Sequence, residues 1–135
     1  MPRVVEKDIE VRWGDLDAFG HVNNTHFLRY LEEARIVLFR GLGVAYKNRE
    51  FGPVVVNVNC NFRREITYPT VVRVRLEATV ASDRRLVLQH AMTDRDQPET
   101  LYADAEITVV WVDSASGRSI PIPSSVRLAL ENGDG

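Results

Sequence analysis

The clearest pattern in the chain is an alternation of apolar and polar residues that recurs in five segments. In residues 72–80, for example, Val72, Val74 and Leu76 alternate with Arg73 and Arg75. A period of two predicts a β-strand with one buried face and one wet face, which is typical of antiparallel sheet. The five predicted strands span residues 5–13, 54–62, 72–80, 86–94 and 101–112.

The same alternation predicts which side chains of the first two strands face the core. The expected apolar face of the first strand consists of Val5, Ile9, Val11 and Trp13. The expected apolar face of the second consists of Val54, Val56, Val58, Cys60 and Phe62, with Asn57, Asn59 and Asn61 opposite.

Between these two strands the period changes to that of a helix. From residue 24 to about residue 39, apolar side chains follow the spacing i, i+3, i+4 and i+7, which predicts an amphipathic helix. Asn23 or Asn24 suits its N-cap and Gly41 suits its end. A shorter helix is predicted at 124–130, after Pro123. We therefore expect an α+β fold in which a long antiparallel sheet wraps around one central helix.

Length and composition predict a single domain over residues 1–135, with a loose tail at about 131–135. The net charge of −2 argues against a nucleic-acid partner, and no apolar run reaches the ~20 residues that span a membrane. The N-terminus lacks the apolar region of a signal peptide, so we expect a cytoplasmic protein without membrane association. One cysteine, Cys60, excludes an internal disulfide.

The residues that can carry chemistry cluster in segment 13–24, directly before the predicted helix. This segment contains Asp15, Asp17 and His21, together with two glycines and two asparagines. The first backbone N–H groups of a helix lack intrahelical partners, so they can bind an anion or a developing oxyanion. A nearby carboxylate could act on the same substrate as a base or nucleophile. Alternatively, both aspartates form only Asx-turns or interact with the helix dipole.

Metal binding by this segment is less well supported. A calcium loop of the EF-hand type fails, because Phe19 and His26 occupy positions that require oxygen ligands. A zinc site built from Asp15, Asp17, His21 and His26 stays open as an alternative, but we expect neither a metal nor a cofactor. His90 and Cys60 lie among apolar strand residues, where a structural role is expected.

The segment Asp-Leu-Asp-Ala-Phe-Gly-His-Val-Asn-Asn at 15–24, followed by residues 27–35, resembles the hotdog-fold acyl-CoA thioesterases. Within that fold it is most similar to the 4-hydroxybenzoyl-CoA thioesterase-like family. The resemblance implies the hotdog fold, hydrolysis of acyl-CoA to free acid and CoA, and a homodimer or homotetramer with active sites at subunit interfaces. Asn23 and Asn24 resemble the fatty-acyl branch, since aromatic-acyl members have an apolar-aromatic pair there.

Carried over residue by residue, the resemblance makes Asp17 the catalytic carboxylate, acting as base or nucleophile. The backbone N–H of Asn24 would polarise the thioester carbonyl. The remaining expected substrate-binding residues are Gly20, His21, Val22, Asn23, Arg63 and Arg64. The two arginines come from residues 61–85, where six arginines stand against three acidic residues and could bind the phosphates of CoA.

Three other functions use the same residues. An acyl-ACP thioesterase would need a basic surface for its acidic carrier protein. A non-catalytic module could bind acyl thioesters while Asp17 served only the turn. A hotdog hydratase would need a histidine paired with a carboxylate on the helix start, and residues 21–24 offer no such pair. Beyond the two aspartates, we expect no titratable partner for His21.

Overall fold

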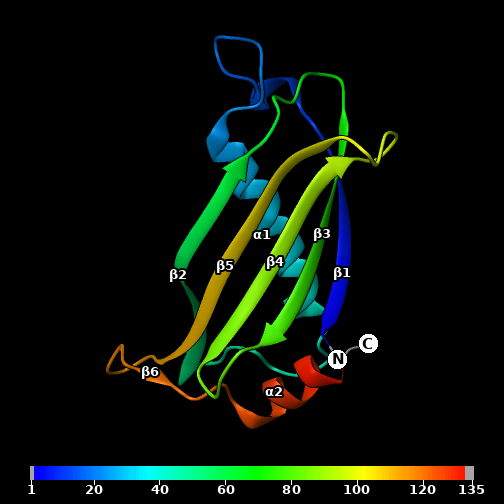
Figure 1. Ribbon diagram of the computed structural model, residues 1–135. Coiled ribbons are helices and arrows are strands. Elements are labelled where there is room, and N and C mark those ends of the chain that lie inside the picture. The colour runs from blue at the N-terminus through cyan, green and yellow to red at the C-terminus, as the bar shows by residue number, and fades with distance from the viewer. Residues whose placement is uncertain (1, 133–135) are drawn as a thin grey trace.

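One long antiparallel sheet curls around helix α1 (Asn24–Arg40), and the core lies between these two layers (Figure 1). The structure is a computed structural model that describes residues 2–132. Its strands are β1 (Arg3–Glu10), β2 (Phe51–Phe62), β3 (Val71–Val80), β4 (Arg85–Asp94), β5 (Leu101–Asp113) and β6 (Ser119–Ile120). They lie in the order β1-β3-β4-β5-β2, with β6 paired to β5. The expected α+β fold is confirmed.

Helix α1 forms where its periodicity predicts. The side chains of its apolar stripe are at most 2% exposed, because they pack against the sheet; they are Phe27, Tyr30, Leu31, Ala34 and Leu38. Asn23 is the N-cap, and its side chain accepts a hydrogen bond from the backbone N–H of Thr25 at 2.9 Å. The helix ends at Gly41, whose N–H donates to the carbonyls of Val37 and Leu38.

The first strand is shorter than predicted. It ends at Glu10, and Trp13 begins a short 3-10 helix, η1 (Trp13–Asp15), instead of extending the apolar face. The carboxylate of Asp15 accepts a hydrogen bond from the backbone N–H of Arg12 at 3.1 Å, and this bond turns the chain out of the sheet. The side chain of Trp13 is consequently exposed, at 75% of its area.

The predicted apolar face of β2 holds for only part of the strand. A β-bulge between Val55 and Asn57 changes the register against β5, so Val55 pairs with Val109 while Val58 pairs with Ile107. One extra residue in a strand moves the side chains that precede it to the opposite face of the sheet, compared with an uninterrupted alternation. Val55 therefore packs against the core, whereas Val54 and Val56 are 40% and 55% exposed.

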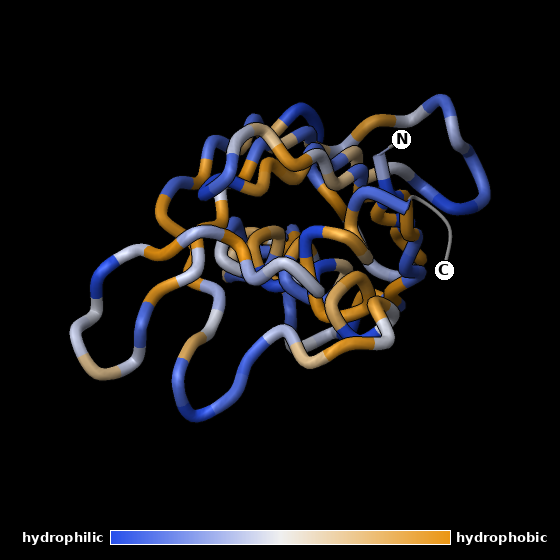
Figure 2. Tube along the Cα trace, turned by 90° about the horizontal axis from the view of Figure 1, so that it is seen from below, coloured by the Kyte–Doolittle hydropathy of each residue, from blue (hydrophilic) through white to orange (hydrophobic). Residues whose placement is uncertain are grey.

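The outer face of the sheet is polar, as the alternation predicts. Arg73 of β3 pairs with Asp8 of β1 at 2.8 Å, and Gln89 of β4 donates to Glu106 of β5 at 2.7 Å. Figure 2, seen from the end where α2 lies, shows apolar stretches in both layers and hydrophilic loops projecting outward.

The short helix α2 (Ser124–Glu131) follows Pro123 and closes the lower end of the core with Val126 and Leu130. Strand β6 was not predicted, and residues 41–50 contain neither strand nor helix. Of the expected tail, residues 133–135 lie outside the described part of the chain. Neither helix is long and apolar enough to cross a membrane in the part of the chain that the structure describes.

His90 of β4 lies in the core, which agrees with its expected structural role. The residue is 4% exposed, and neither ring nitrogen makes a hydrogen bond of good geometry within residues 2–132. Burial lowers the pKa of His90 from its ordinary 6.5 to about 4, although the nearby backbone carbonyls of Ala105 and Leu88 oppose the shift. The folded protein therefore holds a neutral imidazole at neutral pH.

We expect His90→Leu to reduce the acid sensitivity of folding. Between pH 6.5 and pH 4 the unfolded chain binds a proton at His90 that the folded chain does not, so falling pH favours unfolding. Across this window the wild type should lose about 3 kcal/mol more of its unfolding free energy than the variant. Urea unfolding of both proteins at pH 7.5, 5.5 and 4 measures the difference, and parallel pH curves would refute the assignment.

Candidate active site

Residues 16–22 form a small hairpin that places Asp17 and His21 beside the start of α1. Leu16 and Val22 make an antiparallel bridge, and the N–H of Asp17 donates to the carbonyl of His21 at 2.8 Å. The turn closes with a hydrogen bond from the N–H of Gly20 to the carbonyl of Asp17 at 3.1 Å. Gly20 has φ +84°, a conformation that favours glycine over other residues. The hairpin is thus fixed by its own backbone bonds.

The carboxylate of Asp17 is only half engaged by this hairpin. Its Oδ1 accepts the N–H of Phe19 at 2.9 Å and lies 3.5 Å from the N–H of His21, so the predicted Asx-turn is present. Its Oδ2 has no hydrogen-bond partner in residues 2–132. Asp17 therefore stabilises the turn with one oxygen and leaves the other free to act on a ligand.

The start of α1 offers an unpaired donor to the same space. The N–H groups of Thr25, His26 and Phe27 all bond to Asn23. By contrast, the backbone N–H of Asn24 has no protein acceptor in the described chain. Since this N–H is at the positive end of the helix dipole, it suits an anionic or partially negative oxygen.

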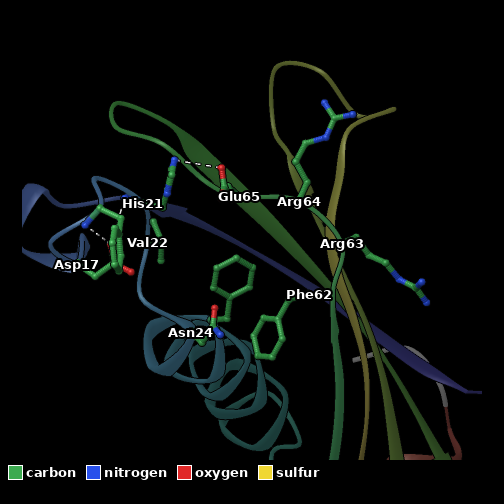
Figure 3. A pocket seen from close by; sticks show the side chains of 10 residues that line it. Asp17, His21, Val22, Asn24, Phe62, Arg63, Arg64 and Glu65 are labelled. Atoms are coloured by element: carbon green, nitrogen blue, oxygen red, sulfur yellow. Dashed lines mark hydrogen bonds and ion pairs between the residues drawn. The ribbon is translucent and has the colours of Figure 1, made fainter.

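A cavity of about 450 Å³ joins these groups. Figure 3 shows Asn24 at the top of α1, with Asp17 and His21 on one side of it and Phe62 on the other. Phe62 contacts Phe27 edge to face, with ring centroids 5.2 Å apart. The cavity is lined by Asp17, Phe19, His21, Val22, Asn24, Phe27, Phe62, Arg63, Arg64 and Glu65. It has one polar wall and one aromatic wall, which suits a ligand with a polar part and an apolar part.

His21 has a carboxylate partner that the sequence did not indicate. Its Nε2 lies 3.1 Å from an oxygen of Glu65, in the loop after β2 (Figure 3). The interpretation that no carboxylate would pair with His21 is therefore wrong. The loop is held next to the hairpin because the N–H of Val22 donates to the carbonyl of Ile66 at 2.9 Å.

Arg63 and Arg64 both line the cavity, but only one of them is paired. Arg63 donates from Nε to Asp104 at 2.7 Å, and this hydrogen bond raises the pKa of its guanidinium. In Figure 3 both side chains point away from Asp17 and Asn24. Arg64 makes no ion pair with the residues described, so its charge stays available. Of the other arginines in the basic stretch, Arg73, Arg75 and Arg85 lie on β3 and β4 and Arg84 lies in the turn between these strands, so none lines the cavity.

Asp15 does not reach the cavity, because its side chain is buried behind the hairpin. Burial by itself would raise the pKa of Asp15, but hydrogen bonds from Tyr30 and Arg12 outweigh it and hold this pKa below its ordinary value. The alternative zinc site would need Asp15 and His26 to meet Asp17 and His21. No three potential ligands among His, Cys, Asp and Glu come together in residues 2–132.

The predicted site residues thus fall into two groups. The structure brings Asp17, His21, Val22, Asn24, Arg63 and Arg64 to one cavity. Gly20 and Asn23 do not line it, but shape the turn and cap the helix. Sequence reasoning missed Glu65; its proximity to Arg63 and Arg64, just after a predicted strand, was the available signal. Cys60 packs against the core, where burial raises the pKa of its thiol. A raised pKa disfavours the reactive thiolate, which agrees with the expected structural role of Cys60.

Comparisons with known proteins find similar chains along most of the length. A profile of the thioesterase-like superfamily matches residues 11–130. Long-chain acyl-CoA thioesterase FadM of Escherichia coli (strain K12) is 29% identical over 134 residues, which cover 94% of this chain and 97% of FadM.

Solved structures agree in fold. The PA2801 protein of Pseudomonas aeruginosa is 39% identical and superposes with a TM-score of 0.83, over 92% of this chain and 95% of its own. Slr0204, a 1,4-dihydroxy-2-naphthoyl-CoA thioesterase from Synechocystis, is 20% identical with a TM-score of 0.88, over 96% of each chain. At that identity the second likeness supports the fold alone.

Proposed function

The chain belongs to the thioesterase-like superfamily, and from that premise we propose that it hydrolyses acyl-CoA thioesters to the free acid and CoA. Membership confirms the resemblance predicted from segment 15–24. The observation that carries the proposal is the pairing of a free carboxylate oxygen on Asp17 with an unpaired N–H on Asn24 at one cavity. Thioester hydrolysis needs a base or nucleophile and an oxyanion donor, and these two groups supply them.

In the proposed reaction the thioester carbonyl oxygen accepts a hydrogen bond from the backbone N–H of Asn24. Oδ2 of Asp17 then either removes a proton from an attacking water or attacks the carbonyl carbon itself. In both routes negative charge develops on the carbonyl oxygen, where the N–H and the helix dipole stabilise it. Collapse of the intermediate breaks the carbon–sulfur bond, and CoA leaves as a thiolate, which needs no strong acid. In the base route this step gives the free acid, and the proton held by Asp17 passes to the thiolate or to solvent. In the nucleophile route the acyl group stays on Asp17 as a mixed anhydride, which a water molecule hydrolyses to the free acid and the regenerated carboxylate.

The aromatic wall of the cavity suits the acyl group. Phe62, which is 45% exposed and packs on Phe27, offers apolar surface at the cavity. In addition, 29% identity to a long-chain acyl-CoA thioesterase over nearly the full length favours a fatty-acyl chain. We propose that Arg64 contacts a phosphate of CoA, since Arg63 is already paired with Asp104.

We further propose that two copies pair through β2. This edge strand of twelve residues carries no charged side chain, whereas the other edge, β1, carries five. Four of its large apolar side chains are 40–55% exposed: Val54, Val56, Val58 and Phe62. Long apolar edges without charges pair with other strands, and Phe62 would bring the interface to the cavity.

Asp17→Asn should lower kcat by about 10²- to 10⁴-fold, because it removes the charge and basicity while preserving the shape of the turn. KM should change much less, since the contacts to CoA and the acyl chain remain. Thiol release from acyl-CoAs ranging from acetyl to palmitoyl and aromatic measures both constants. This assay also separates hydrolysis from hydration, which leaves the thioester intact.

A folded Asp17→Asn protein with near-native kcat would remove Asp17 from the mechanism. A wild-type protein that binds acyl-CoA without releasing thiol would instead support the non-catalytic module. Replacing acyl-CoA by acyl-ACP in the same assay tests the alternative carrier.

His21→Ala should cost less activity than Asp17→Asn. Nε2 of His21 is engaged by Glu65 at 3.1 Å, so we expect His21 to position the substrate rather than to act as the base. Kinetics of His21→Ala and Glu65→Gln, compared at saturating acyl-CoA, measure the contribution of this pair. If His21→Ala were inactive while folded and Asp17→Asn stayed active, His21 would be the base.

Wild-type protein should scatter light as a dimer or a larger assembly, at twice the chain mass of 15.3 kDa or more. Val58→Lys should reduce this mass, because a lysine on an edge strand opposes pairing. Val4→Lys is the matched control, since Val4 is similarly exposed on the opposite edge strand. A wild-type monomer at micromolar concentration contradicts the proposed interface.

A further inference from the structure

Asp15 is the most deeply buried carboxylate described, and each of its two oxygens has a partner. It is 2% exposed, and its Oδ2 accepts the hydroxyl of Tyr30 at 2.6 Å and the backbone N–H of Arg12 at 3.1 Å. Its Oδ1 lies 3.2 Å from the Arg12 guanidinium and 3.4 Å from Nε2 of His26. We call these four side chains the Asp15 network. A buried charge is costly unless it is paired in this way, so its contacts are specific.

The Asp15 network joins two segments, the chain around η1 and helix α1. Through Arg12 it fixes η1, and through His26 and Tyr30 it holds the first two turns of α1. The backbone of Asp15 adds a fourth link, because its carbonyl accepts the N–H of Asn23, the N-cap residue, at 3.0 Å. One residue therefore connects the chain entering the hairpin with the helix that follows it.

The two groups of the proposed reaction flank these links in sequence. Asp17 lies two residues after Asp15, and Asn24 lies directly after Asn23. The position of the Asp17 carboxylate relative to the Asn24 N–H thus depends on how firmly Asp15 holds α1. Asp15 itself does not line the cavity and has no free oxygen, so it is unsuited to attack a substrate.

We propose that Asp15 is a positioning residue, whose bond to Tyr30 fixes Asp17 against the oxyanion donor of α1. This inference rests on the proposed thioester hydrolysis for its kinetic consequence. Displacing a catalytic group by about 1 Å can cost about 10²-fold in rate, although the protein stays folded. The hydroxyl of Tyr30 is the part of the network that can be removed without leaving a cavity.

The test variant is Tyr30→Phe, because Asp15→Asn leaves a buried, unpaired amide and can unfold the chain. We expect kcat to fall about 10- to 100-fold while KM changes less than threefold. The matched control is Tyr102→Phe, since Tyr102 is 6% exposed and donates its hydroxyl to Asp94 at 2.8 Å. Neither Tyr102 nor Asp94 lines the cavity, so the control should keep wild-type kcat.

A double-mutant cycle separates positioning from general destabilisation. If the Tyr30 hydroxyl acts through Asp17, Tyr30→Phe should cost no more than twofold in an Asp17→Asn background. Full additivity of the two losses would overturn the proposal, as would a wild-type kcat for Tyr30→Phe. An equal loss of kcat in Tyr102→Phe would also overturn the proposal.

Hydrogen exchange keeps this test independent of catalysis. Backbone amides of residues 15–24 should exchange faster in Tyr30→Phe than in the wild type or in Tyr102→Phe, while the sheet stays protected. If the wild type released no thiol, the proposed function would fail, and unchanged exchange in this segment would separately overturn the positioning role.

Discussion

The whole site depends on how helix α1 buries its apolar stripe. The stripe from Phe27 to Leu38 is buried against the inner face of the curled sheet, and this packing holds the helix in place. Its N-terminus then lies at the end of the sheet where β1 gives way to the hairpin and β2 leads into its loop (Figure 1). Unpaired helix N–H groups are unavoidable, and here the unpaired one of Asn24 opens on a cavity.

Two aspartates two residues apart have opposite roles because their surroundings differ. Asp15 is held on both oxygens by Arg12, Tyr30 and His26, so its charge stabilises the connection between hairpin and helix. Asp17 uses one oxygen for the turn and keeps the other free. The proposed chemistry needs little more, because a thiolate leaves readily and the proposal assigns the oxyanion donor to the helix start.

The secondary structure was largely predictable, because each element has a strong periodic pattern. The stripe of α1 and the alternation in β3, β4 and β5 were decisive, and segment 15–24 indicated where the candidate site lies. The errors have local causes that periodicity does not register. Trp13 lies outside the strand because the carboxylate of Asp15 accepts a hydrogen bond from the backbone N–H of Arg12. Val56 is exposed because of the β-bulge between Val55 and Asn57.

The pairings within the site were harder to predict, since they join residues far apart in sequence. Glu65 meets His21 only because the loop after β2 bonds to Val22. Arg63 and Arg64 look equivalent in sequence, but Asp104, on the neighbouring strand, pairs with only the first. Tyr30 belongs to the apolar stripe of α1, so periodicity predicts that its side chain is buried. The periodicity does not predict that its hydroxyl donates a hydrogen bond to Asp15.

The proposed mechanism requires that the thioester carbonyl oxygen binds at the Asn24 N–H while Asp17 faces the carbonyl carbon. A crystal structure with a non-hydrolysable acyl-CoA analogue, in which a methylene separates the carbonyl from sulfur, tests it most directly. We expect the carbonyl oxygen about 2.7–3.1 Å from the Asn24 nitrogen, with Oδ2 of Asp17 directed at the carbonyl carbon. A bound analogue whose carbonyl lies away from Asn24, or whose carbonyl carbon Asp17 cannot reach, would contradict it.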